Sequence, residues 1–114
     1  MERFYLLLHE NPRSYDNVSP ADMQAIIGRY VKWRNDMAAE GSVTGGHKLE
    51  DGTGRYLRAG KVHDGPFTEG KEVIGGLFII QAEGWAEAEA IARTCPHCEF
   101  GAVEVRAVDV PTVA

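Results

Sequence analysis

The sequence predicts an α+β fold in which two helices pack on one face of an antiparallel sheet. Three observations support this prediction. The 114 residues have room for a single domain, residues 1–114. Short apolar runs and amphipathic segments follow one another in the order β-α-β-β-α-β. Ten of the thirteen glycines fall between Gly41 and Gly76, which indicates that turns concentrate in the middle third of the chain.

The first half of the chain predicts one strand and one long helix. The apolar run from Phe4 to His9 ends at Glu10-Asn11-Pro12, which is typical of a strand followed by a turn. Ser19 can cap a helix that begins at Pro20, and Gly41 can end it. Because apolar residues recur at helical spacing between these signals, we expect a helix over about residues 20–40.

The second half predicts three further strands, a hairpin and a helix. Ala59-Gly60 separates two short polar-apolar runs, as expected of a tight β-turn. Pro96 stops the second amphipathic segment. The expected elements are a strand at 44–49, a hairpin at 55–63, a strand at 76–83, a helix at 85–94 and a strand at 102–108.

This order corresponds to the ferredoxin-like arrangement, in which one sheet face carries both helices. The other sheet face of a monomer would be exposed to solvent, and strands with one exposed face normally alternate apolar and polar residues. The strands at 4–9 and 76–83 do not alternate, because both of their faces are apolar. We therefore expect two copies to pack sheet against sheet as a homodimer, a dimeric α+β barrel.

Composition excludes several classes of partner. Twelve basic and seventeen acidic residues give a formal net charge of -5 without a basic run, so a nucleic-acid binder is not expected. No apolar run approaches the length of a membrane span, and the short run near the N-terminus does not resemble a signal peptide. We expect a cytoplasmic protein with reduced thiols and no membrane partner.

Cys95-Pro96-His97-Cys98 is similar to the reactive string of strongly oxidising disulfide-exchange proteins. It follows the end of a predicted helix instead of preceding one, so a helix N-terminus does not stabilise a thiolate there. We interpret the string as a surface turn with two incidental cysteines. A zinc site would need a second ligand pair at matching spacing, so no metal is expected. The glycines also lack a complete nucleotide-binding motif, and no cofactor is expected.

The segment from His63 to Glu72 gathers a histidine and several carboxylates around a Gly-Pro bend. An Asp beside a His can tune a proton-transfer group toward neutral pH, as general acid–base catalysis requires. A polar loop in which Asp64 only caps a turn is the alternative interpretation.

The string DGPFTEGKEVIGGLFII, residues 64–80, resembles the signature of the YCII-related, or DGPF-domain, family. The strings FYLLLHEN, RYLRAGKVHDGPF and GAVEVRAV are also similar to that family. The resemblance implies a ferredoxin-like fold, a dimeric α+β barrel and a cleft for acid–base chemistry. Family members are suspected of pairing an Asp with a His on the first helix. This chain has Tyr30 and Trp33 there instead.

Two functions follow from these observations. The first is a small-molecule acid–base enzyme of lyase or isomerase type, acting on a small carbonyl- or carboxylate-bearing metabolite. The alternative is a non-catalytic accessory protein, either ligand-binding or, as the resemblance implies, sigma-factor-associated and regulatory. For the enzyme, the candidate catalytic residues are Asp64, His63, His9 and Tyr30, and the candidate substrate-binding residues are Gly65, Pro66, Phe67, Lys71 and Glu72.

Overall fold

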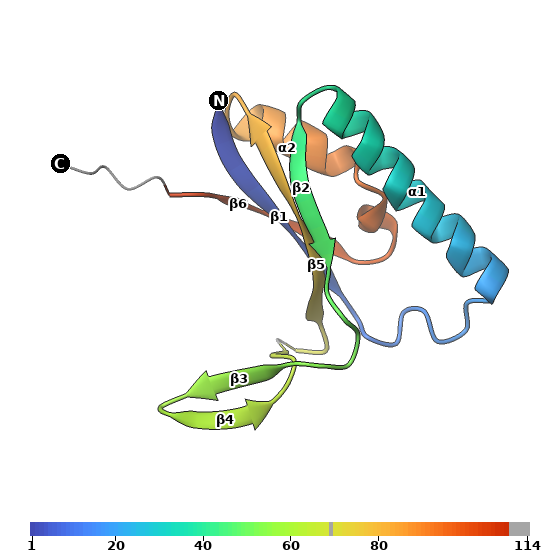
Figure 1. The fold of residues 1–114 in the computed structure, drawn as a ribbon, viewed down its shortest axis with the longest axis vertical. Coiled ribbons are helices and arrows are strands. Elements are labelled where there is room, and N and C mark those ends of the chain that lie inside the picture. The colour runs from blue at the N-terminus through green and yellow to red at the C-terminus, as the bar shows by residue number, and fades with distance from the viewer. Residues whose placement is uncertain (69, 110–114) are drawn as a thin grey trace.

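The computed structural model describes residues 1–68 and 70–109. Within these residues the chain forms six strands, two α-helices and one 3-10 helix, η1 (Figure 1). The elements are β1 (Glu2–Glu10), α1 (Pro20–Ala39), β2 (Val43–Lys48), β3 (Arg55–Arg58), β4 (Lys61–Asp64), β5 (Val73–Ala82), α2 (Trp85–Thr94), η1 (Pro96–Glu99) and β6 (Ala102–Ala107).

Four strands form one antiparallel sheet in the order β2-β5-β1-β6, and both α-helices lie on the same side of it (Figure 1). The connection through α1 joins β1 to β2 with β5 between them. The connection through α2 joins β5 to β6 with β1 between them. This is the ferredoxin-like arrangement, and it confirms the fold class predicted from the sequence.

The core lies between the sheet and the helices. Phe4, Leu6 and Leu8 alternate along β1 toward the helices and are buried, as the two-residue period of a strand requires. From α1, Trp33 packs edge-on against Phe78 at 4.9 Å between ring centroids. Burying side chains of this size contributes about 1.5–3 kcal/mol each, so these contacts fix α1 on the sheet.

Local signals set the ends of α1. The Ser19 hydroxyl accepts a hydrogen bond from the backbone N–H of Asp22 at 3.1 Å, and Pro20 is the first helical residue. Gly41 follows the C-cap with φ of 79°, a conformation that glycine adopts without steric cost. The helix expected over about 20–40 is therefore confirmed.

The predicted hairpin also forms, but outside the main sheet. Strands β3 and β4 make a separate two-stranded sheet below the body of the molecule (Figure 1). Ala59 and Gly60 both have positive φ at its turn, as a two-residue hairpin loop requires. On one side of the hairpin, the Tyr56 ring stacks on His63 at 4.8 Å between centroids. Its other side exposes Leu57 and Val62.

The sheet face away from the helices is uncovered in the single chain. Tyr5, Leu7, Leu77 and Ile79 lie on it and are only half-buried. We call these four residues the open apolar face. In the part of the chain that the structure describes, no helix has the length and apolar character needed to cross a membrane.

Candidate functional site

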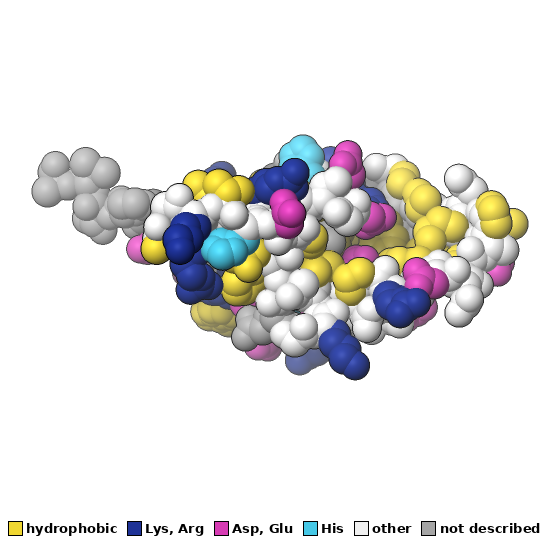
Figure 2. All heavy atoms as spheres, turned by 90° about the horizontal axis from the view of Figure 1, so that it is seen from below, with side chains coloured by type: hydrophobic (Ala, Val, Ile, Leu, Met, Phe, Trp, Pro, Cys, Tyr) yellow, Lys and Arg dark blue, Asp and Glu magenta, His cyan; other side chains and the backbone are white. Residues whose placement is uncertain are grey.

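A cavity of about 320 Å³ lies between α1 and the sheet. Seen from below, it appears as a hollow with hydrophobic side chains inside and acidic side chains at the rim (Figure 2). Its roof is the apolar side of α1, and its floor includes three glycines of β2 and β5 together with Phe78. The roof residues are Met23, Ile26, Ile27 and Val31, and the glycines are Gly46, Gly75 and Gly76.

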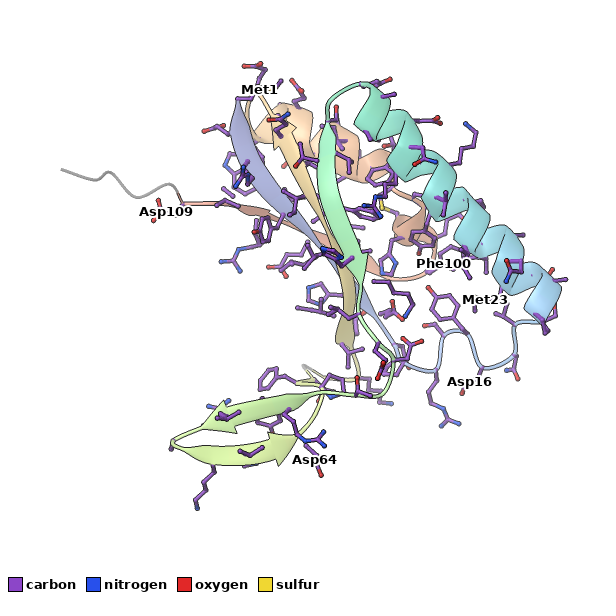
Figure 3. All side chains as sticks on the ribbon, in the orientation of Figure 1. Met1, Asp16, Met23, Asp64, Phe100 and Asp109 are labelled. Atoms are coloured by element: carbon purple, nitrogen blue, oxygen red, sulfur yellow. The ribbon has the colours of Figure 1, made fainter. Side chains whose placement is uncertain are left out.

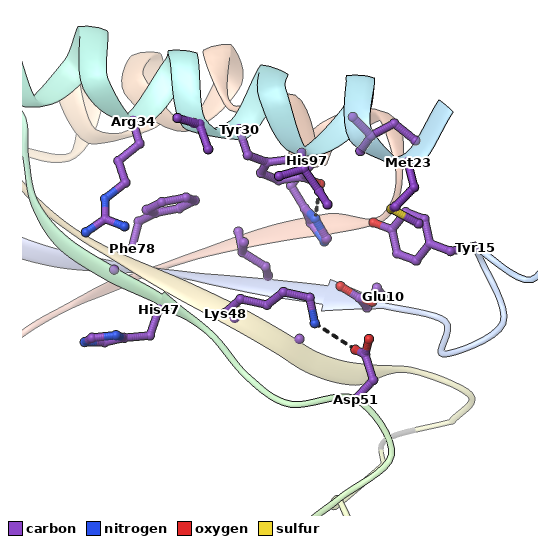
Figure 4. Close-up of a pocket in the computed structure, with 17 residues that line it drawn as sticks. Glu10, Tyr15, Met23, Tyr30, Arg34, His47, Lys48, Asp51, Phe78 and His97 are labelled. Carbon is purple, nitrogen blue, oxygen red and sulfur yellow. Dashed lines mark hydrogen bonds and ion pairs between the residues drawn. The ribbon is translucent and has the colours of Figure 1, made fainter. Parts of the chain in front are cut away.

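His97 forms part of the inner wall and has an exposed fraction of 1%. Its Nε2 lies 2.8 Å from the backbone oxygen of His9, and its Nδ1 lies 2.8 Å from the Tyr30 hydroxyl (Figure 4). Because a carbonyl oxygen only accepts hydrogen bonds, Nε2 carries a proton. In neutral His97, Nδ1 therefore accepts the hydrogen bond that Tyr30 donates.

The chain around η1 holds this imidazole in place. Pro96 begins η1, and Cys95 before it is buried. Gly101 follows η1, and a Cβ at this position would collide with the backbone oxygen of His9 and lie 3.1 Å from His97 Nε2. Glycine at position 101 therefore permits the close approach that the hydrogen bond between His97 and His9 needs.

Glu10 is the last residue of β1, and its exposed fraction is 9%. Its carboxyl lies in the cavity and has no hydrogen-bond or ion-pair partner among residues 1–68 and 70–109 (Figure 4). The pairing of β1 with β5 shifts by one residue beside it, between Leu8 and His9, and Gly75 lies at the shift. A Cβ on Gly75 would lie 2.6 Å from Glu10 Cδ, so glycine at position 75 provides the space for this carboxyl.

The cavity changes the acidity of its polar groups. Burial raises the pKa of Glu10 above its usual range, and the charge of Asp51 adds to that, while His97 and Lys48 act in the opposite direction. Burial also raises the pKa of Tyr15 and, more strongly, that of Tyr30. Both tyrosines therefore keep their hydroxyl protons at neutral pH.

Two cationic side chains, Lys48 and Arg34, line the cavity and differ in their carboxylate contacts. The Lys48 Nζ donates hydrogen bonds to Asp51 Oδ1 and to the backbone oxygen of Leu49, each at 2.9 Å. Arg34, on α1, has no carboxylate partner in the described part of the chain. It extends toward the sheet beside Phe78 (Figure 4). Among the residues that the structure describes, Lys48 is thus paired with a carboxylate and Arg34 is not.

The DGPF loop does not line this cavity in the single chain. Asp64 ends β4 with 92% of its side chain exposed, 3.4 Å from the Nε of Arg55 (Figure 3). His63 stacks on Tyr56, also in the hairpin. The candidate substrate-binding residues Gly65, Pro66, Phe67, Lys71 and Glu72 lie outside the cavity lining as well. The structure therefore does not bring Asp64 and His63 to Tyr30.

Of the four candidate catalytic residues, Tyr30 is the one whose side chain lines the cavity. The His9 side chain lies on the opposite sheet face, where its Nε2 is 2.7 Å from Glu104 Oε1. Only the His9 backbone oxygen takes part in the cavity, through its hydrogen bond with His97.

Sequence reasoning missed Glu10 and His97. Glu10 continues the buried parity of Phe4, Leu6 and Leu8, and this continuation is the signal that could have found it. The interpretation of residues 95–98 as a surface turn is wrong for Cys95 and His97, which are buried, whereas Cys98 is exposed. Cys95 and His97 are buried because η1 packs against α1 and β6.

No group of three or more His, Cys, Asp or Glu side chains among the described residues is arranged to hold a metal ion. Among the polar groups that line the cavity are a carboxyl, a phenol and an imidazole, which are groups that can transfer protons.

The fold and the cavity define a small ferredoxin-like α+β protein with a partly open polar-apolar site between α1 and the sheet. Residues 3–110 match the YCII-related domain, and the chain belongs to this family. Among solved structures, it is similar to 5-chloro-2-hydroxyhydroquinone dehydrochlorinase from Burkholderia phenoliruptrix, in complex with 2,5-dihydroxybenzoquinone. The two chains are 18% identical, with 94% of this chain and 93% of that chain covered and a TM-score of 0.50, which shows a shared fold. The comparison with curated proteins finds no match.

Proposed function

We propose that this protein is a small-molecule acid–base enzyme of lyase or isomerase type and that the cavity under α1 is its active site. The observation that carries this proposal is the carboxyl of Glu10, a residue that is largely buried; its oxygens stay open to the cavity and have no hydrogen-bond partner among residues 1–68 and 70–109, in the same cavity as the hydrogen-bonded Tyr30 and His97. A small metabolite with a carbonyl or carboxylate group is the proposed substrate class.

Glu10 acts as the general base in this proposal. Its raised pKa makes the carboxylate a stronger base than an exposed one. The carboxylate takes a proton from the carbon beside the substrate carbonyl, and the C–H electron pair forms a carbon–carbon double bond. The carbonyl oxygen then gains charge and needs a proton. An isomerase returns the Glu10 proton to another carbon, whereas a lyase expels a leaving group with its electron pair.

Tyr30 and His97 supply the proton to the substrate oxygen. When His97 is protonated, both of its ring nitrogens donate, and the Tyr30 oxygen accepts from Nδ1. The Tyr30 hydroxyl then donates toward the cavity. As Tyr30 gives up its proton to the substrate, it takes the Nδ1 proton of His97, so the phenol ends the step neutral. The hydrogen bond to the His9 backbone oxygen keeps the ring oriented in both states.

The structural neighbour supports the reaction class. A dehydrochlorinase removes the elements of hydrogen chloride, so a base must take a proton while a leaving group departs. Glu10, Tyr30 and His97 provide groups suited to that kind of step on the same fold.

The experiment uses pyruvate, 2-oxobutyrate, acetoacetate and phenylpyruvate as probes in D₂O, with proton NMR reporting exchange of the protons beside the carbonyl. We expect the protein to accelerate exchange of at least one probe. Glu10→Gln should lower that rate by about 100-fold or more, because the amide cannot accept the proton. Glu89→Gln, an exposed change on α2, is the matched control and should leave the rate unchanged.

Absence of catalysed exchange with all four probes, or exchange that survives Glu10→Gln, would contradict the proposed enzyme. It would favour the alternative of a non-catalytic ligand-binding or regulatory protein. The predicted roles of Asp64 and His63 remain a competing prediction, which Asp64→Asn tests in the same assay.

We also propose that the protein acts as a cytoplasmic homodimer. The open apolar face supports this, because four large apolar or aromatic side chains on one sheet face gain hydrophobic stabilisation when a second copy covers them.

A further inference from the structure

The cavity has the shape of a slot with chemically different ends. Its roof is apolar side chains of α1, and its floor includes the Phe78 ring and the Glu10 side chain, which take the space beside Gly46 and Gly75. A Cβ on Gly46 would lie 2.5 Å from Cδ1 of the Phe78 ring, so the glycine allows that ring to lie close to β2. A flat ligand suits a slot between the Phe78 ring and an apolar roof.

One end of the slot carries an unpaired positive charge. Arg34 has no carboxylate partner among the residues that the structure describes, whereas Lys48 is held by Asp51. A guanidinium presents two parallel N–H donors, which match the two oxygens of a carboxylate. This end of the slot is therefore suited to an anion.

The other end carries Glu10, Tyr30 and His97. Tyr30 and Arg34 are one helical turn apart on α1, and four residues at 1.5 Å per residue separate them by about 6 Å along the helix axis. This separation is comparable to the length of one ring with substituents on opposite carbons. The apolar roof and Phe78 would contact such a ring between its two polar substituents.

We propose that the cavity binds a small planar monoanion: a carboxylate against Arg34, a single flat ring in the slot, and an oxygen substituent at Tyr30 and Glu10. This assignment of substrate class rests on the proposed function for the identity of the reacting end. The anion site itself depends on Arg34 and on the shape of the slot.

The test is isothermal titration calorimetry with 4-hydroxybenzoate as the probe. We expect saturable binding to one site per chain. Arg34→Gln should weaken it by about tenfold or more, because the carboxylate loses a charge-assisted pair of hydrogen bonds. Arg93→Gln, an exposed change on α2 that removes the same charge, should leave binding unchanged.

Two comparison ligands separate charge from shape. The neutral 4-hydroxybenzamide should bind about tenfold more weakly than the acid, and the puckered trans-4-hydroxycyclohexanecarboxylate should also bind more weakly. Equal binding of the amide, equal binding by Arg34→Gln, equal weakening by Arg93→Gln, or no binding of 4-hydroxybenzoate at millimolar concentration would overturn the proposal. Equal binding of the cyclohexane analogue would overturn the planar requirement.

This experiment needs no turnover, so its failure can be distinguished from failure of the proposed enzyme. Binding that depends on Arg34, with no Glu10-dependent exchange, would retain the anion site and contradict the acid–base function. Glu10-dependent exchange without Arg34-dependent binding would retain the acid–base function and overturn the anion site.

Discussion

Glu10 is a largely buried residue whose carboxyl oxygens stay open to the cavity and have no hydrogen-bond partner among residues 1–68 and 70–109. Removing a carboxylate from water costs free energy unless other groups compensate it. Here the nearby charges act in both directions, since His97 and Lys48 favour the carboxylate while Asp51 opposes it. A group kept in such a position is suited to proton transfer, and it should also reduce the stability of the fold.

We expect Glu10→Gln to raise the melting temperature, and to raise it more at pH 8 than at pH 4. Because the pKa of Glu10 is higher in the folded chain than in the unfolded chain, the folded chain binds more protons than the unfolded chain at pH values between the two. The free energy of unfolding therefore falls over that range, and the glutamine variant avoids this loss. Calorimetry of the wild-type protein, Glu10→Gln and the control Glu89→Gln at both pH values would measure the difference. An equal gain at the two values, or a loss at pH 8, would contradict this account.

Sequence alone could identify only part of the site at this scale. Tyr30 was a candidate because it lies on the long helix. Its partner His97 is 67 residues away, and the His9 backbone oxygen is 88 residues from His97. No local pattern indicates such pairs, because they form only when β1, α1 and η1 pack together. The motif around Asp64 was conspicuous in the sequence, yet its side chain is exposed in the single chain.

At the scale of elements, the junction between η1 and β6 positions the proton-transfer pair. Gly101→Ala should lower the free energy of unfolding by about 1–3 kcal/mol, because the added Cβ meets the backbone oxygen of His9. It should also slow the exchange reaction, since the same Cβ lies beside His97 Nε2. Urea unfolding and the exchange assay measure the two effects.

Gly28→Ala is the matched control for this prediction. A Cβ on Gly28 meets no atom within 4 Å, and the residue lies within α1. Alanine there should stabilise the chain by about 0.5–1 kcal/mol through its better helix propensity. A Gly101→Ala variant as stable and as active as the wild type would show that this junction does not position His97.

The elements themselves were largely predictable because their signals are local. Ser19, Pro20 and Gly41 mark the ends of α1, and Ala59-Gly60 marks the hairpin turn. The placement of that hairpin outside the main sheet was not predictable, because nothing within residues 55–64 indicates whether they pair with the strands of the main sheet. The structure of η1 was missed for a related reason: its burial depends on α1 and β6.

At the scale of the whole molecule, the two faces of the sheet have different roles in this account. The helix side encloses the cavity, and the other side carries the open apolar face formed by Tyr5, Leu7, Leu77 and Ile79. Apolar residues on both faces of β1 and β5 are explained if a second copy covers the open face.

Light scattering at micromolar concentration should give twice the 12.5 kDa of one chain. Leu7→Glu should convert the dimer to a monomer, because the new charge lies on the open face beside Glu104, its pairing neighbour on β6. Leu57→Glu, on the exposed hairpin, is the matched control and should remain dimeric. A wild-type mass of one chain would contradict the homodimer.

In the proposed enzyme, the chemistry takes place in the cavity at Glu10. Its most direct test is the exchange rate of one responsive probe with Glu10→Gln and Asp64→Asn, measured side by side against the wild type. We expect a loss of about 100-fold or more for Glu10→Gln and a nearly unchanged rate for Asp64→Asn. A large loss for Asp64→Asn, with Glu10→Gln still active, would contradict it and assign the chemistry to the DGPF loop.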